Sequence, residues 1–163
     1  MKNDSFDQFR NRVRLRVCGL CRDGNGLLMI KHRKLGPLGE LWIPPGGGVD
    51  FGKSLTQSLE KEFLEETGLR VEVGDHLFTY EYIDGPLHAV EFFFEVANYE
   101  GQPVLGYDPE LPEDEQIMEE VLFLSFETID SMDKNVLHGI FKECQKSEDV
   151  FDLRGLFKFK KYA

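Results

Sequence analysis

Three glutamates, Glu62, Glu65 and Glu66, stand in the segment KEFLEETGL at a spacing that places them on one face of an α-helix. Carboxylates at this spacing repel one another, so a helix gains no stability from the cluster. Mg²⁺ prefers oxygen ligands and often links carboxylates to the phosphates of a substrate. The spacing therefore indicates a metal site, although a solvated acidic helix face would show the same pattern.

Three consecutive glycines, residues 46–48, precede this helix. Glycine lets the backbone approach a ligand or another segment closely, so Gly47 and Gly48 are candidate ligand-binding positions. Ser54 followed by Gln57 is a capping box, which predicts a helix over 54–67. An apolar stripe of Leu55, Leu59 and Phe63 would face the core, and Thr67-Gly68 would end the helix.

The segment 47–69 resembles the signature of the Nudix hydrolases, G-x5-E-x7-R-E-U-x-E-E-x-G-U, where U is a bulky apolar residue. Gly47 begins the pattern, the three helix glutamates occupy its later carboxylate positions, and Gly68 and Leu69 end it. The resemblance implies an α/β (α+β) fold, a Nudix-type α/β/α sandwich with a mixed central sheet. It also implies Mg²⁺, or alternatively Mn²⁺, held by Glu62, Glu65 and Glu66, and one domain over residues 1–163.

Two positions depart from that signature, because Lys53 replaces the early Glu and Lys61 replaces the Arg. In the family these two residues usually pair and hold the loop against the helix. Two lysines cannot form this pair, and the two-pronged donor set of Arg is lost. Lys61 can still reach Glu65, and Asp50 or Glu60 could pair with Lys53.

Two further segments offer side chains for a phosphate substrate. The basic run 31–34 contains Arg33, whose planar fork suits phosphate oxygens. Nudix enzymes often take another catalytic carboxylate from the region that corresponds to the acidic segment 108–120. Glu115, Glu119 and Glu120 qualify by position, and we favour Glu115 as base or extra ligand. A solvated basic turn and a solvated acidic loop remain the alternative readings.

Composition limits the partners of the chain. Its net charge of −11 at pH 7 opposes binding to long nucleic acids or anionic membranes. The polar start MKNDSFDQFRNR and the lack of a long apolar stretch predict a cytoplasmic protein. Cys18 and Cys21 lie in an apolar segment without evident metal partners, which predicts buried thiols.

Turn and periodicity signals predict the remaining elements. A hairpin is expected from 13–22 and 26–31 around Asp23-Gly24-Asn25-Gly26, and strands are expected over 70–84, 88–98 and 121–126. A second helix is expected within 128–145. The tail from Glu148 could dock on the domain, add an edge strand or join a homodimer.

The resemblance implies Mg²⁺-dependent hydrolysis of a nucleoside diphosphate linked to another group. A nucleotide or sugar nucleotide is the expected substrate, and Pro86, which lies near a proline common in ADP-ribose hydrolases of the family, slightly favours ADP-ribose or another sugar nucleotide. A nucleoside triphosphate is a further candidate. The alternative is a catalytically weak or inactive module that binds nucleotides or proteins.

Overall fold

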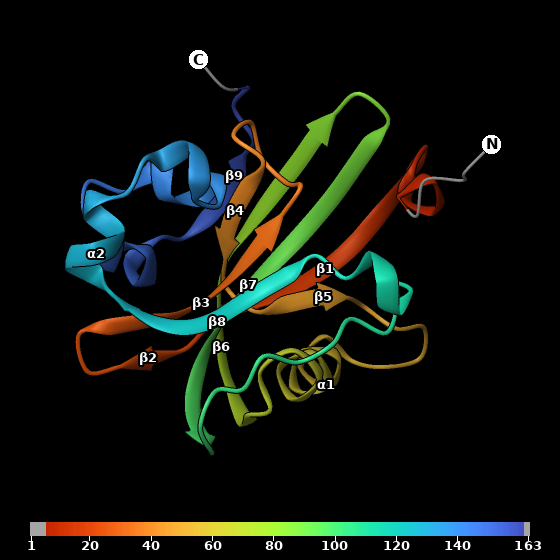
Figure 1. Ribbon diagram of the computed structural model, residues 1–163. Helices are drawn as coiled ribbons and strands as arrows, with labels where there is room; N and C mark the ends of the chain where they lie inside the picture. Colours follow the sequence, from red (N-terminus) through yellow and green to blue (C-terminus); the bar gives the residue numbers. More distant parts are fainter. Residues whose placement is uncertain (1–5, 162–163) are drawn as a thin grey trace.

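The computed structural model describes residues 6–161, which form two β-sheets with helices on either side (Figure 1). The larger sheet is mixed, since β1 runs parallel to β7 and β6 parallel to β9, while the other pairs are antiparallel. Its strands follow the order β5 (Gly46–Gly48), β1 (Arg12–Leu20), β7 (Leu87–Glu100), β6 (Arg70–Asp84) and β9 (Gly155–Lys158).

The smaller sheet is antiparallel and is built around β3 (Gly26–Arg33). One edge of β3 pairs with β8 (Met118–Ser125). The other edge pairs first with β2 (Arg22–Asp23) and then with β4 (Glu40–Ile43). The glycine loop of the sequence is therefore strand β5 of the larger sheet, at the edge of β1.

Helix α1 (Leu55–Thr67) lies on one side of the sheets, and the short helices of residues 126–152 lie on the other (Figure 1). The expected α/β sandwich with mixed strands is confirmed, with the strands divided between two sheets. The short helices are α2 (Phe126–Ser131) and the 3-10 turns η3 (Lys134–Val136), η4 (Gly139–Glu143) and η5 (Ser147–Asp152). Two further 3-10 turns are η1 (Asp7–Phe9) and η2 (Glu113–Glu115).

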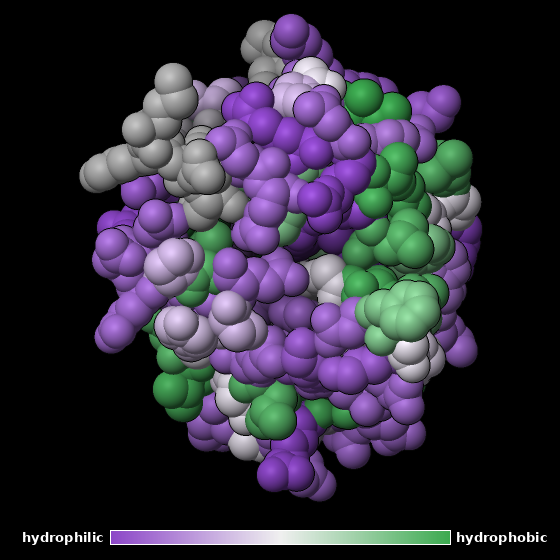
Figure 2. Space-filling model, turned by 90° about the vertical axis from the view of Figure 1, so that its right-hand side faces the viewer, coloured by the Kyte–Doolittle hydropathy of each residue, from purple (hydrophilic) through white to green (hydrophobic). Residues whose placement is uncertain are grey.

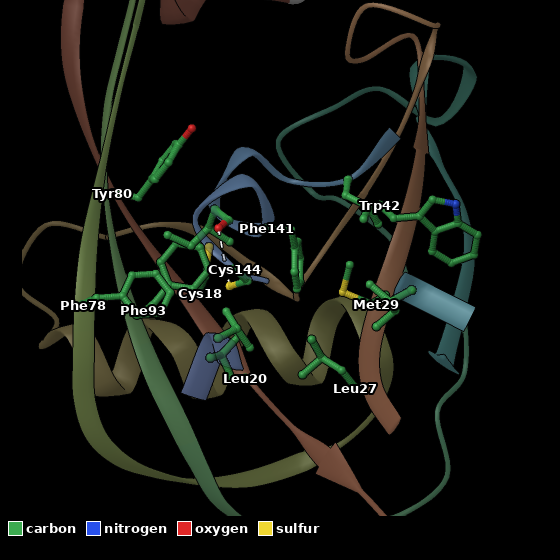
Figure 3. Close-up of a cluster of buried hydrophobic side chains, with 14 of the residues drawn as sticks. Cys18, Leu20, Leu27, Met29, Trp42, Phe78, Tyr80, Phe93, Phe141 and Cys144 are labelled. Carbon is green, nitrogen blue, oxygen red and sulfur yellow. Dashed lines mark hydrogen bonds between the residues drawn. The ribbon is translucent and has the colours of Figure 1, made fainter. Parts of the chain in front are cut away.

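Two hydrophobic clusters form the core. The larger one fills the space between the sheets and the short helices (Figure 3), where the rings of Phe78 and Phe93 stack with centroids 4.5 Å apart. The smaller cluster packs α1 onto the sheets through Leu59 and Phe63. Cys18 and Cys21 are buried free thiols, as the sequence predicted.

The predicted hairpin is correct at its turn and wrong for most of its first strand. Only β2 pairs with β3 there, whereas residues 12–20 form β1 of the other sheet. The chain passes between the sheets at Cys21, whose carbonyl still accepts a hydrogen bond from the Leu28 N–H. Because residues 17–21 are buried throughout, their sequence pattern did not show which sheet they join.

The second helix expected within 128–145 is α2, but it begins earlier, at Phe126, and already ends at Ser131, after which only 3-10 turns follow. The side chains of Asp133 and His138 each accept a backbone N–H two residues on, which favours new short turns over one continuous helix. In addition, the His138 N–H donates to the Trp42 carbonyl, which holds this segment against β4.

The C-terminal tail, left open by the sequence, adds β9 to the edge of the larger sheet beside β6. The face shown in Figure 2 is mostly hydrophilic, with hydrophobic side chains gathered along one side. Among residues 6–161, no helix is long and apolar enough to cross a membrane.

Helix α1 is held at both ends. The Ser54 side chain accepts the Gln57 N–H and the Gln57 side chain accepts the Ser54 N–H, which confirms the predicted capping box. At the other end the segment 104–107 donates backbone N–H groups to the last carbonyls of the helix, those of Glu65, Glu66 and Thr67. This contact fixes the start of the acidic loop beside α1.

We expect Gly106→Ala to destabilise the protein by about 1–3 kcal/mol, because the added Cβ would overlap the Glu65 carbonyl group. Backbone on both sides of the contact leaves little room for adjustment. Thermal unfolding of this variant would be compared with that of Gln102→Ala, an exposed position just before this segment. Equal melting temperatures of the two variants would show that the segment does not press on the helix end.

Candidate active site

A cavity of about 290 Å³ opens beside α1 and β5 among the described residues. One end is polar, and its charged side chains are Arg14, Arg16, Glu62, Glu66, Glu91, Asp108 and Glu110. The other walls are mainly apolar and aromatic and include Leu87, Tyr82 and Phe159. Its size and its mixed lining suit a small molecule with an anionic end and a flat or apolar end.

Glu62 lies directly against the glycine strand. A Cβ added at Gly47 would overlap the carboxyl group of Glu62, so only glycine admits this contact. A Cβ at Gly48 would lie 3.4 Å from Glu110 Oε1. The strand β5 thus brings a helix carboxylate and a loop carboxylate close together at the polar end of the cavity.

Glu66 also enters the cavity and is only 7% exposed, which argues against the alternative reading of a solvated acidic helix face. Burial and the negative charge of Glu62 raise the pKa of Glu66 well above its ordinary value. Burial and the charges of Glu65 and Glu110 raise the pKa of Glu62 to about 7. Each carboxyl group makes ionisation of the other less favourable, so the pair retains a proton more readily than an ordinary glutamate does.

Glu65 does not line the cavity and instead faces Lys61, whose Nζ lies 3.6 Å from Glu65 Oε1. Its other oxygen, Oε2, is buried without a hydrogen-bond partner. Within residues 6–161 no three acidic, His or Cys side chains stand close enough together to hold a metal ion as they are. The structure therefore brings together Glu62 and Glu66, and leaves Glu65 beside them.

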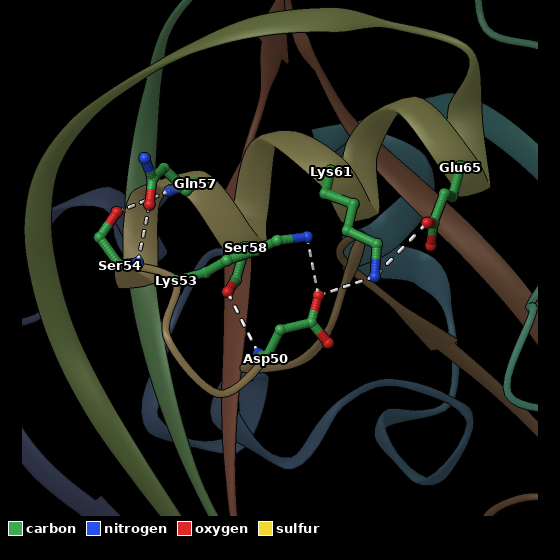
Figure 4. Close-up of polar contacts among 7 residues, drawn as sticks. All are labelled: Asp50, Lys53, Ser54, Gln57, Ser58, Lys61 and Glu65. Atoms are coloured by element: carbon green, nitrogen blue, oxygen red, sulfur yellow. Dashed lines mark hydrogen bonds and ion pairs between the residues drawn. The ribbon is translucent and has the colours of Figure 1, made fainter.

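The loop before α1 is held by Asp50, which contacts both lysines that depart from the Nudix signature (Figure 4). Asp50 Oδ2 accepts hydrogen bonds from Lys61 Nζ at 2.8 Å and from Lys53 Nζ at 3.1 Å. These hydrogen bonds, with that of Lys61 the larger cause, lower the pKa of Asp50. A carboxylate between two lysines thus links loop and helix in this chain.

Of the acidic loop, the structure places Asp108 and Glu110 in the cavity, and neither was singled out from the sequence. Glu115 has a buried, unpartnered Oε2 but does not line the cavity, and Glu119 pairs with Lys31 at 3.5 Å. Glu120 is exposed on β8. No motif distinguishes the glutamates of this loop, so only the fold shows which of them lies in the cavity with Glu62 and Glu66.

Arg33 lies outside the cavity, where its Nε and one terminal nitrogen donate to the carbonyl of Gln116 at 3.1 Å and 2.7 Å. The Gln116 side chain in turn closes the acidic loop through hydrogen bonds to the backbone of Asp108 and Leu111. The arginines in the cavity are Arg14 and Arg16. Their alternation along β1 is the sequence signal that could have identified them.

We expect Asp50 to couple more strongly to Lys61 than to Lys53. Double-mutant cycles of thermal unfolding with Asp50→Asn, Lys61→Met and Lys53→Met isolate the two couplings. All three groups are partly exposed, so each coupling should lie within ~0–1 kcal/mol. A larger coupling to Lys53, or none to either lysine, would contradict this description of the loop.

The raised carboxyl pKa values predict a loss of stability with rising pH in the metal-free protein. The folded protein binds the proton of Glu62 more tightly than the unfolded chain does. This proton binding contributes fully to the free energy of unfolding below pH 4.5, the ordinary pKa of Glu, and the contribution is lost as the pH rises through about 7. Glu62→Gln cannot ionise, so its melting temperature should fall less over this window. Glu60→Gln, an exposed glutamate of the same helix, should follow the parent protein. Parallel curves for all three proteins would rule out the raised pKa.

Comparison with known proteins agrees with this geometry. The NUDIX domain matches residues 11–142. An RNA pyrophosphohydrolase from Mesorhizobium japonicum is 41% identical, over 29% of this chain and 31% of its own length. The match therefore spans less than a third of that relative.

Solved structures share the fold at low sequence identity. The MutT protein from Methanosarcina mazei Go1 has a TM-score of 0.65 and 21% identity, covering 87% of this chain and 92% of its own. An ADP-ribose pyrophosphatase from Streptococcus suis 89-1591 has a TM-score of 0.54 and 17% identity, covering 88% and 98%. With the domain match spanning most of its length, the chain belongs to the NUDIX domain family.

Proposed function

We propose that this protein is a divalent-metal-dependent hydrolase that cleaves the phosphoric anhydride of a nucleoside diphosphate linked to another group. The observation that carries the proposal is the buried carboxyl pair of Glu62 and Glu66, which faces a cavity of ligand size in a NUDIX domain. A buried pair of like groups is costly for folding, and such pairs are typical of functional sites.

The donor set fits Mg²⁺ or Mn²⁺, because both ions accept carboxylate oxygens. Glu62 and Glu66 would hold the cation, and Glu65 would contribute through its unpartnered Oε2. Since these groups are not assembled as a three-ligand site, phosphate oxygens of the substrate would complete the ligand set. When bound, the cation would stabilise the charge that develops on the diphosphate.

Glu110 is the loop carboxylate that we assign as general base. It lines the cavity, lies against Gly48 and acts on the pKa of Glu62. From this position it would accept the proton of the attacking water. Glu115, our choice from the sequence, stays a candidate only if the loop rearranges when substrate binds, because it does not line the cavity.

The substrate class follows from the two ends of the cavity. The polar end would take the diphosphate, and the apolar and aromatic walls would take a base or sugar. Names of similar proteins include RNA pyrophosphohydrolase and ADP-ribose pyrophosphatase. We place ADP-ribose and other sugar nucleotides first, because the net charge of −11 disfavours long nucleic acids.

A non-catalytic binding module is the second candidate, and two observations favour it. Lys53 and Lys61 replace the usual pair of the signature, and no three-ligand metal site is assembled in the described part of the chain. Incubation with a panel of nucleotides and Mg²⁺, with release of nucleoside monophosphate or phosphate recorded, separates the two. Tight binding without turnover of any compound would favour the module.

We expect Glu66→Gln to lower turnover at saturating Mg²⁺ by at least ~100-fold. Loss of a residue that only hydrogen-bonds to a metal ligand already lowers metal affinity or activity by about 10–100-fold, and loss of a ligand itself should cost more. Glu110→Gln should lower it by ~10²–10⁴-fold, as for the loss of a general base. The fold of Glu66→Gln should persist, because Gln resembles the protonated form of Glu66. Glu60→Gln serves as the control on the same helix. Near-native turnover of both site variants would contradict the assignments.

A further inference from the structure

Arg16 lies in the wall of the cavity, on the face of β1 that points toward Glu62 and Glu66. Its positive charge acts on both glutamates and lowers their pKa values, against the larger effect of burial. The side chain is 20% exposed, so it is mostly buried and open only toward the cavity. Arg16 therefore places a positive charge beside the carboxyl pair.

Glu91, a buried residue of the neighbouring strand β7, forms an ion pair with Arg16. Glu91 Oε2 accepts the Arg16 Nε–H at 3.4 Å and the Cys18 Sγ–H at 3.5 Å. Burial raises the pKa of Glu91, but the contacts with His138 and Arg16 outweigh burial and hold this pKa below its ordinary value. Glu91 is therefore a fixed anion that orients the guanidinium.

His138 holds the other oxygen of Glu91. The Ile140 N–H donates to His138 Nδ1 at 3.0 Å, so Nδ1 carries a lone pair and the ring proton lies on Nε2. That Nε2–H then donates to Glu91 Oε1 at 2.8 Å. Both oxygens of Glu91 are thus fixed, one by His138 at the start of η4 and the other by Arg16 and Cys18 of β1.

The contact with Glu91 uses only the Nε of Arg16. Within residues 6–161 its two terminal nitrogens have no hydrogen-bond partner. The other arginine of the cavity differs, because the guanidinium of Arg14 stacks on the Phe9 ring at 3.7 Å and lies 3.9 Å from Glu110 Oε2. Arg16 is therefore the arginine whose fork is both fixed and open beside the carboxyl pair.

We propose that Arg16 binds a phosphate of the substrate through its terminal nitrogens, and that Glu91 and His138 are positioning residues for it. The proposal rests on the proposed function, and it replaces Arg33 by Arg16 as the phosphate contact. In a chain with a net charge of −11, a fixed guanidinium offers a dianionic substrate local attraction at the polar end of the cavity. A planar fork also fixes the orientation of the phosphate.

The test measures binding of inorganic pyrophosphate in the presence of Mg²⁺ by calorimetry, together with KM and kcat on any nucleotide that is turned over. Arg16→Gln should weaken pyrophosphate binding by ~10–100-fold, since it removes hydrogen bonds to a charged group. Arg16→Lys keeps the charge but loses the fork, so it should weaken binding less and raise KM more than it lowers kcat. Arg12→Gln, an exposed arginine of the same strand, is the control.

Glu91→Gln separates a positioning role from a purely electrostatic one. Removing the negative charge behind Arg16 would tighten anion binding if only charge mattered. If Glu91 orients the guanidinium, the variant binds pyrophosphate more weakly and raises KM. Should Glu91→Gln or Arg16→Gln fail to fold, Arg16→Lys, which can still pair with Glu91, decides the question.

The outcomes distinguish this inference from the proposed function. Suppose that Arg16→Lys and Arg16→Gln both turn over substrate with unchanged KM and bind pyrophosphate with unchanged affinity. This outcome would overturn the role of Arg16 and would leave the proposed hydrolase function standing. Weaker binding in Arg33→Gln, with none in the Arg16 variants, would restore Arg33 as the contact. If no nucleotide is hydrolysed, the proposed function fails, and pyrophosphate affinity still decides the role of Arg16.

Discussion

The close approach of the Glu62 carboxyl group to the glycine strand is the constraint on which the rest of the site depends. Because Gly47 has no side chain, the carboxyl group packs on the backbone of β5, and Glu66 lies one helical turn away in a buried position. Two neighbouring carboxyl groups that are both buried cannot easily ionise at the same time. In the function that we propose, a bound cation would favour the ionised form of both groups.

This constraint needs a helix that cannot shift relative to the sheet. The capping box fixes its first turn, Asp50 connects the loop to Lys61, and segment 104–107 binds its last carbonyls. On the core side, Phe63 packs on β1 where Gly19 leaves space for its ring. The same segment 104–107 leads into the loop that carries Asp108 and Glu110, so the contacts that hold the helix also place the loop carboxylates.

Local sequence signals predicted the features that local interactions determine. The capping box of Ser54 and Gln57, the turn at 84–86 and the strands it joins all depend on near neighbours, and the structure has them. The predictions failed where distant contacts decide. The passage of β1 into the other sheet and the pairing of His138 with Trp42 could not be inferred from composition or periodicity. Glu110 and Arg16, to which we assign roles in the site, were not selected from the sequence for the same reason, because only the fold shows that they line the cavity.

The central claim is that the carboxyl pair of Glu62 and Glu66 retains a proton that a divalent cation displaces. Calorimetric titration with Mn²⁺ near pH 6, repeated in buffers of different ionisation enthalpy, measures the protons released for each ion bound. The account predicts that at least about one proton leaves per ion, and that Glu66→Gln releases fewer. Binding of Mn²⁺ without proton release, or equal release by the parent protein and Glu66→Gln, would contradict it.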